Sequence, residues 1–179
     1  AMAQADRGKQ TWRTDINQND PGHALFPALN FNTDELSCAI GLASLNRLEE
    51  TIERRKAFVE QLVRELTAVS TVCQPFPFNG NASPFFHPVF VDGSKIGISK
   101  IEFAQALRAE GVDLNDHYGC VVSEWKWAQP YFPEDFQCPN AVNMKNGSFN
   151  LFLNENYGES EVEDIVRAVT KLEACLLSD

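Results

Sequence analysis

The sequence lacks the long hydrophobic segments that would place it in a membrane. None of its 179 residues lies in an apolar run of about 18, the length that crosses a bilayer. The first residues also lack the charged and then apolar pattern of a secretion signal. We therefore expect neither a membrane span nor a membrane partner.

The few cysteines of the chain are not spaced as in a disulfide framework or a metal site. Five cysteines are scattered along the chain, at Cys38, Cys73, Cys120, Cys138 and Cys175, and no CxxC pair occurs. The odd count and irregular spacing favour reduced core thiols in a cytoplasmic protein. No cluster of His and Cys has the spacing of metal ligands, so no metal site is predicted.

The familiar catalytic motifs are absent, and positive charge is scarce. The sequence contains no glycine-rich phosphate loop before a helix, no GxSxG and no HExxH. Lys and Arg number 15 against 25 Asp and Glu, a net charge of −10. Such an acidic surface disfavours nucleic acid as a partner. A small anionic ligand remains possible because it needs only a few local donors.

One stretch, residues 33–68, has the strongest helical pattern. Asn32 and Glu35 have the spacing of a capping box, and apolar residues follow mostly at three- and four-residue steps. The first half, Leu36 to Leu45, is apolar all round, which indicates burial on two sides, as at a subunit interface.

The remaining pattern predicts an α+β fold. Strands are expected at residues 86–91, 112–115 and 149–153. Helices are expected from the cap Ser99 to Gly111 and over residues 159–177, with a loop at 74–84 and an irregular aromatic segment at 120–147. This order favours a small antiparallel or mixed sheet that is covered by helices, with one long N-terminal helix.

The chain is expected to comprise an arm and one domain. Residues 1–29 contain the turn Asp20-Pro21-Gly22 and form the arm, in which Ala1–Ala3 is interpreted as a remnant of cloning. Trp12 and Phe26 indicate that the arm packs against something. Residues 30–179 form the domain.

Two local features are candidates for binding. Asn30 and Asn32 precede a helix N-terminus, where unpaired amides can hold a phosphate. His117 and Tyr118 follow a short strand and have polar tips suited to a sugar or phosphate oxygen. Each pair also has a simpler interpretation: the asparagines cap and turn the chain, and His117 and Tyr118 are satisfied by nearby backbone.

Three other side chains also have both a functional and a structural interpretation. His87, within an apolar strand, is interpreted as a packed core histidine. Trp125 and Trp127 can stack on a ligand ring, but packing of the irregular segment is the simpler interpretation.

Several motifs resemble those of the DegT/DnrJ/StrS sugar aminotransferases. The segment that starts at Asn30-Phe31-Asn32 is similar to the family's GYNFRMSELQAAIGLAQLxRLD motif. Further resemblances follow in the family's order at Arg54-Arg55, residues 86–91, residues 103–111, His117-Tyr118, residues 138–141 and the last helix. Together they cover residues 28–176.

The resemblance implies the fold of type I aminotransferases and a homodimer. The family uses pyridoxal 5′-phosphate (PLP), held by a lysine in an N-terminal domain, to move an amino group, usually from glutamate, onto a nucleotide-linked keto-sugar. This chain is similar to the C-terminal part only, without the domain of the PLP lysine. Lys126, between two tryptophans, is not expected to replace that lysine, so no catalytic residue is predicted here.

The resemblance also suggests roles for individual residues. Asn30 would reach the PLP phosphate of the other subunit, and His117 with Tyr118 would lie near the sugar-nucleotide. Asn32 stands where the family has Arg or Lys, so the contact with an anion is weakened or moves to another residue such as Arg13.

Three interpretations remain at this stage. The chain is the C-terminal part of such an aminotransferase, a stand-alone non-catalytic module for sugar-nucleotide binding or dimerisation, or an unrelated small α+β binding domain.

Overall fold

The computed structural model describes residues 2–18, 20–31, 33–118 and 120–177. The chain divides into two compact units. Residues 1–43 and 119–145 form the first, called the arm unit, and residues 44–118 and 146–179 form the second, called the sheet unit.

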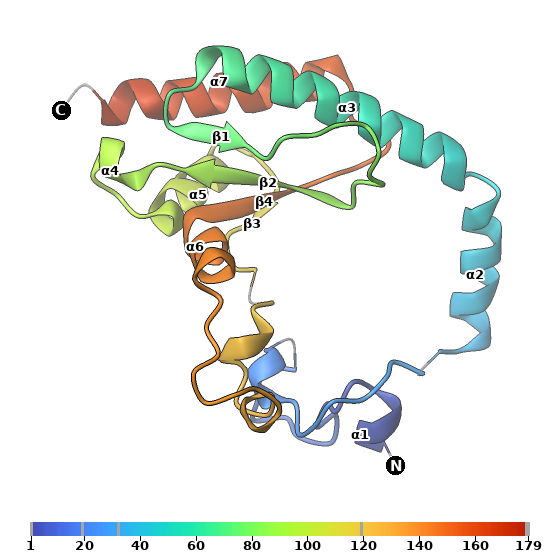
Figure 1. The fold of residues 1–179 in the computed structure, drawn as a ribbon. Coiled ribbons are helices and arrows are strands. Elements are labelled where there is room, and N and C mark those ends of the chain that lie inside the picture. Colours follow the sequence, from blue (N-terminus) through green and yellow to red (C-terminus); the bar gives the residue numbers. More distant parts are fainter. Residues whose placement is uncertain (1, 19, 32, 119, 178–179) are drawn as a thin grey trace. The chain divides into compact units, whose positions relative to one another are not determined.

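An antiparallel sheet lies at the centre of the sheet unit (Figure 1). Its four strands follow one another across the sheet in the order β1 (Cys73–Pro75), β2 (Phe86–Val91), β4 (Ser148–Phe152) and β3 (Leu114–Asn115). The last strand in the chain, β4, is therefore internal and pairs with both β2 and β3.

One face of this sheet is built from buried side chains. His87, Val89 and Val91 alternate with less buried neighbours along β2. Val89 lies opposite Phe149 and His87 lies opposite Leu151, and both β4 residues are buried as well. Successive strand side chains point to opposite faces, so this register places all five on the core side.

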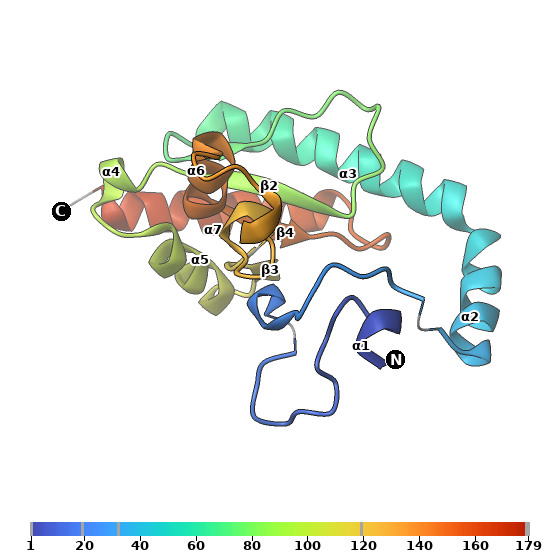
Figure 2. The same ribbon diagram turned by 60° about the horizontal axis from the view of Figure 1, so that its bottom comes forward.

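Three helices cover that face. They are α3 (Leu48–Val69), α5 (Lys100–Ala109) and α7 (Glu159–Leu176). Helix α7 packs against both of the others, beside α3 in Figure 1 and beside α5 in Figure 2. The two layers confirm the predicted fold class, a small sheet covered by helices.

The residues predicted to begin and end α5 have these roles in the structure. The Ser99 backbone amide donates to the Glu102 carboxylate at 2.8 Å, and the Ser99 hydroxyl accepts from the Glu102 amide at 3.3 Å. This capping box satisfies amides that a helix start leaves unpaired. Gly111 follows the helix with a φ of +97°, a conformation that favours glycine.

The stretch predicted as one helix over residues 33–68 is divided in two. Helix α2 (Glu35–Leu45) ends before a turn at Asn46 and Arg47, and α3 begins at Leu48. Arg47 has φ −114° and ψ 2°, outside the helical region.

The cap of α2 also differs from the prediction. Asp34 accepts from the Ser37 amide at 2.8 Å and from the Ser37 hydroxyl at 2.7 Å. These hydrogen bonds, the hydroxyl first, lower the pKa of Asp34. Asp34 is therefore the capping side chain, whereas the predicted cap, Asn32, lies outside the described residues.

Beyond the N-terminal arm, one strand and two α-helices have no counterpart in the prediction. Strand β1 lies at the edge of the expected loop at 74–84, helix α4 (Gly93–Ile96) follows the strand expected at 86–91, and helix α6 (Pro139–Gly147) lies in the expected irregular segment. All are short or weakly patterned, so local sequence carries little signal for them.

The arm unit contains short elements linked by hydrogen bonds. The carboxamide of Gln18 donates to the carbonyl oxygens of Gln10 at 3.0 Å and Arg13 at 2.8 Å. Its helical turns are α1 (Met2–Ala5), η1 (Pro21–His23), η2 (Val122–Glu124) and η3 (Gln129–Tyr131). Across the described residues of both units, no helix has the length and apolar character needed to span a bilayer.

Candidate functional site

Asn30 lies on a short pairing of two backbone segments in the arm unit. It forms an antiparallel bridge with Asp6, and the next amide, that of Phe31, donates to the carbonyl of Ala5 at 2.9 Å. The Asn30 side chain is exposed. The backbone is thus fixed while the carboxamide remains accessible to a partner molecule.

The start of α2, five residues later, is a poor anion site by itself. Its first turn contains the Asp34 carboxylate, which already accepts from the Ser37 amide. The lowered pKa of Asp34 keeps that carboxylate ionised near neutral pH. An incoming phosphate would meet negative charge there, so the start of α2 does not by itself form an anion site.

Arg13 is engaged in an exposed ion pair with Asp15. Its guanidinium donates to both carboxylate oxygens, at 2.9 Å from Nε and 2.5 Å from Nη2. This pairing raises the pKa of Arg13 and lowers the pKa of Asp15 to about 2. Arg13 can therefore bind an anion only by sharing or leaving its carboxylate partner.

His117 and Tyr118 lie at the end of β3 in the sheet unit. The His117 amide donates to the Asn115 side chain at 2.9 Å, and its Nδ1 lies 3.0 Å from the carbonyl of Asp116. Because a carbonyl can only accept, Nδ1 is the donor, which leaves Nε2 of the neutral ring as an acceptor. The Tyr118 ring packs on Phe86 with centroids 5.1 Å apart.

The four described candidates thus fall into two groups. Asn30 and Arg13 belong to the arm unit, whereas His117 and Tyr118 belong to the sheet unit. Within the sheet unit, Lys100 supports the end of β3 by donating to the carbonyl of Asp116 at 2.5 Å and to that of Ser148 at 2.9 Å. The sequence did not indicate Lys100, because the contact depends on strand pairing.

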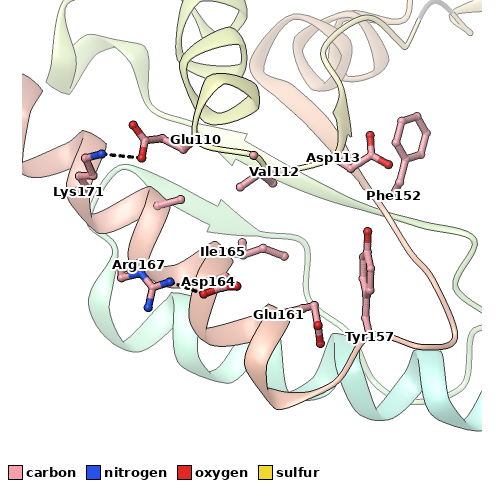
Figure 3. A pocket seen from close by; sticks show the side chains of 12 residues that line it. Glu110, Val112, Asp113, Phe152, Tyr157, Glu161, Asp164, Ile165, Arg167 and Lys171 are labelled. Carbon is pink, nitrogen blue, oxygen red and sulfur yellow. Dashed lines mark hydrogen bonds and ion pairs between the residues drawn. The ribbon is translucent and has the colours of Figure 1, made fainter.

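The sheet unit contains a cavity of about 380 Å³ beside α7 (Figure 3). Lys171 donates to Glu110 at 2.6 Å, and Arg167 is ion-paired with Asp164. Glu161 accepts from the Gly158 amide and so closes the start of α7. Most charges around this cavity therefore have structural partners, and neither His117 nor Tyr118 lines it.

The arm unit contains a larger cavity, of about 490 Å³. Trp125 and Trp127 line it, together with the cations Lys9 and Arg7. The sequence pointed to the two tryptophans as possible ring contacts. It gave no reason to connect them with Lys9 or Arg7, which lie far away along the chain.

His87 and Cys73 lie in the core as predicted, whereas Cys38, Cys120 and Cys175 are exposed, so the expectation of core thiols is wrong for those three. His87 is buried, and its burial lowers its pKa to about 4. Cys73 is buried too, and desolvation raises its pKa to about 12. Among residues 2–18, 20–31, 33–118 and 120–177, no group of three or more His, Cys, Asp or Glu side chains could hold a metal ion.

Comparison with known proteins identifies relatives along nearly the whole chain. Residues 2–170 match the model of the DegT/DnrJ/EryC1/StrS aminotransferase family. The chain is 25% identical over 150 residues to the spore coat polysaccharide biosynthesis protein SpsC of Bacillus subtilis, a match that covers 80% of this chain and 37% of that protein.

Solved structures show the same fold. An aminotransferase from Psychrobacter cryohalolentis matches with a TM-score of 0.66 and 15% identity, over 98% of this chain and 48% of that one. The aminotransferase TlmJ from Streptoalloteichus hindustanus matches with a TM-score of 0.62 and 22% identity, over 97% and 44%. The chain spans less than half the length of these relatives.

Proposed function

Because the chain belongs to the DegT/DnrJ/EryC1/StrS aminotransferase family, we propose that it is the C-terminal part of a PLP-dependent aminotransferase. The family match over residues 2–170 carries this proposal. The substrate we propose is a nucleotide-linked keto-sugar, with glutamate as the amino donor. The similarity to SpsC, which is described as a polysaccharide biosynthesis protein, supports a sugar substrate.

In this proposal the chain contributes contacts and the other part of the enzyme contributes the reacting lysine. PLP would supply the electron sink for amino transfer. The exposed carboxamide of Asn30 would donate to the PLP phosphate of the partner subunit, with Asn32 beside it. The fixed backbone at Asn30, bridged to Asp6, supports this role because a rigid donor loses little entropy on binding.

The substrate contacts would come from His117, Tyr118 and Arg13. Nε2 of His117 can accept a hydrogen bond from a sugar hydroxyl, because Nδ1 is held by the Asp116 carbonyl. The Tyr118 ring, packed on Phe86, is held in a defined orientation. Arg13 would exchange its contact with Asp15 for one with the substrate phosphates.

Helix α2 would form the interface of a homodimer, which we place in the cytoplasm. None of its residues is buried within the chain. Leu36, Ile40, Leu42 and Leu45 remain 70%, 59%, 68% and 62% exposed. A soluble protein rarely leaves so much contiguous apolar surface uncovered, which supports a protein partner on this helix.

The test uses the complete gene product that contains this chain. We expect it to transfer the amino group of glutamate to a nucleotide-linked keto-sugar, and we expect Asn30→Ala to lower PLP affinity by about tenfold, since a hydrogen bond to a charged group contributes about 1.5 kcal/mol or more. Dialysis followed by PLP absorbance measures retention. Asn46→Ala, in the turn between α2 and α3, is the control. Unchanged retention in Asn30→Ala would remove the phosphate role, and no amino transfer by the wild type would remove the function.

A further inference from the structure

Strand β3 ends just before Asp116 and His117, so pairing within the sheet does not fix this part of the chain. The strand pairs with β4 over two residues, and its last pair joins Asn115 to Asn150. Continued in the same antiparallel register, His117 would lie opposite Ser148. Because the pairing stops before that point, the backbone groups of the two diverging segments need other partners.

Lys100, the first residue of α5, donates to both of these segments. Its Nζ lies 2.5 Å from the carbonyl oxygen of Asp116, directly after β3, and 2.9 Å from that of Ser148, the first residue of β4. A single ammonium therefore bridges the two segments where their backbone pairing has ended. The same contact fixes the direction of the peptide group that joins Asp116 to His117.

The location of Lys100 is not explained by the needs of its helix. The first turn of a helix favours negative charge, and the capping residue Glu102 meets that preference in α5. A lysine beside it opposes the helix dipole. Lys100 is also half-buried although it carries a charge. Its two contacts with carbonyl oxygens compensate for both costs, because they provide acceptors for a partly desolvated ammonium.

The carbonyl of Asp116 also holds the imidazole of His117. Nδ1 of the ring lies 3.0 Å from this oxygen. A carbonyl oxygen has two lone pairs, so it can accept from Lys100 and from the Nδ1–H group together. A proton on Nδ1 leaves Nε2 of the neutral ring as an acceptor. A contact that fixes this carbonyl therefore also fixes the tautomer of the ring.

Two neighbouring side chains act on other atoms. The Asn115 side chain accepts from the backbone amide of His117 at 2.9 Å, which restrains the backbone but not the ring. Nη1 of Arg108 lies 3.9 Å from the carboxylate of Asp116, which is longer than a hydrogen bond. Lys100 differs from both because it contacts the carbonyl oxygen that orients the imidazole.

We propose that Lys100 is a positioning residue for the substrate contact of His117. Its ammonium fixes the Asp116 carbonyl, and this carbonyl holds the ring in the tautomer whose Nε2 accepts a hydrogen bond from a hydroxyl group. Lys100 acts through His117 and not by contact with the substrate. This role rests on the proposed function, because the proposed function identifies the hydroxyl as that of a sugar, whereas the state of the ring is measurable without substrate.

The first measurement is NMR of the imidazole nitrogens in the isotope-labelled chain. It is made at about pH 8.5, well above the ordinary pKa of histidine, so that neutral tautomers are observed. The chain has three histidines, and the signals of His117 are those lost in His117→Gln. We expect the wild type to carry the His117 proton predominantly on Nδ1. A proton predominantly on Nε2 would overturn the proposal without any change at Lys100.

The second measurement compares substitutions. Lys100→Met keeps the apolar stem and removes the ammonium, and we expect the ratio of Nδ1-protonated to Nε2-protonated ring to fall at least about threefold, the effect of one weakened hydrogen bond. Lys95→Met is the matched control, because Nζ of Lys95 donates to the carbonyl of Thr71 at 2.7 Å, elsewhere in the sheet unit. This control should keep the wild-type ratio.

A conservative substitution separates a lost contact from a disturbed loop. Lys100→Arg retains the charge and can donate to two acceptors, so it should keep the proton of His117 predominantly on Nδ1. Circular dichroism checks the fold of each variant. An unchanged ratio in a folded Lys100→Met would contradict the positioning role. Equal losses in Lys100→Arg and Lys100→Met would contradict it as well, because any change at this position would then have the same effect.

Kinetics of the complete gene product distinguish this role from the proposed function. Lys100→Met should raise the KM for the sugar at least about threefold and change kcat little, because the hydroxyl contact is present in both the ground state and the transition state. An unchanged KM would remove the link between the ring and the substrate. A wild type that transfers no amino group would contradict the proposed function, and the tautomer ratio would still decide whether Lys100 positions His117.

Discussion

His87 connects the stability of the fold with pH. The side chain is 3% exposed, its Nε2 has no hydrogen-bond partner among the described residues, and burial lowers its pKa from 6.5 to about 4. The folded state thus holds His87 neutral, whereas the unfolded chain takes up a proton near pH 6.5. Between these values the unfolded state binds more protons, so stability falls as pH decreases.

We expect the free energy of unfolding to drop by up to about 3 kcal/mol between pH 6.5 and pH 4 through this residue. Urea unfolding at several pH values measures the slope. His87→Gln, which cannot titrate, should flatten it, whereas His23→Gln, at a half-exposed histidine of the arm unit, should leave it unchanged. An identical slope in His87→Gln would show that other groups cause the acid sensitivity.

Glu173 is a buried carboxylate that holds the turn after α3. Although it is only 5% exposed, it accepts from the Ser70 hydroxyl and from the amides of Thr71 at 3.2 Å and Cys73 at 3.3 Å. These donors lead from α3 into β1. The carboxylate therefore accepts hydrogen bonds from groups between α3 and β1 that have no acceptor within the helix or the strand.

Glu173→Gln should destabilise the chain by about 1.5–3 kcal/mol, because an amide accepts these donors less strongly and brings a donor of its own among them. Thermal unfolding gives the measurement. Glu163→Gln, on the exposed side of the same helix, removes the same charge and should change the melting temperature little. Equal effects of the two substitutions would mean that net charge, rather than the buried contacts, determines the result.

Residue-level roles could be predicted from the sequence only where the local pattern was sufficient. His87 lies in an apolar strand, and the apolar neighbours on both sides of it predicted its place in the core. Glu173 stands in a helix whose charged positions look solvated, and its partners lie about 100 residues earlier in the chain. Lys9 and Trp127 also lie far apart in the chain, and no local pattern predicts that both line one cavity.

At the scale of the elements, α2 is an apolar helix with no apolar partner in the described chain. Its exposed residues include Ile40 and Leu42. Burial of such side chains contributes about 1.5–3 kcal/mol each. We therefore expect the chain to self-associate through this helix, and we expect Ile40→Glu to raise the dissociation constant at least about tenfold.

Sedimentation equilibrium of the wild type and Ile40→Glu provides the measurement. Ala57→Glu, at an exposed position of α3, is the control because it adds the same charge to a helix with a conventional solvated face. Since α2 contributes nothing to the core, Ile40→Glu should leave the unfolding free energy of the monomer nearly unchanged. Association that is equally strong in both variants would assign the interface to another surface.

The elements themselves were predictable where start and stop signals are short-range. The capping box at Ser99 and Glu102 and the glycine at 111 predicted the bounds of α5, and the short run Phe86–Val91, apolar apart from His87, predicted β2 over the residues observed. Strand β1 is three residues long and ends in Pro75, so it exists only because β2 pairs with it. The break between α2 and α3 was missed because no proline or glycine marks it.

For the whole molecule, the order of elements was enough to predict a helix layer on one sheet, because each apolar face has to be covered. It could not predict that residues 119–145 join the N-terminal residues in one unit, since that association depends on contacts between distant segments. The candidate site shows the same limit. Local sequence pointed to Asn30 and His117 as binding candidates and the motif resemblance suggested their roles, whereas the surroundings of each became visible only in the fold.

The two units should differ in their resistance to local opening. Every residue of the buried apolar cluster, from Phe58 to Val169, belongs to the sheet unit. Amides that open only when a core is disrupted exchange slowly, and amides in regions with few buried contacts exchange fast. Hydrogen–deuterium exchange of the dilute chain should therefore give strong protection in β2, β4, α3 and α7, and weak protection in α1 and α2.

The dependence of α2 exchange on protein concentration distinguishes a weakly packed helix from one that is covered in a dimer. If α2 is covered by a second copy of the chain, its exchange should slow as the protein concentration rises, while the rates in β2 and β4 stay constant. Ile40→Glu should abolish that dependence. Slow exchange of α2 in a dilute monomer would contradict the proposal, because the helix would then be stable without any partner.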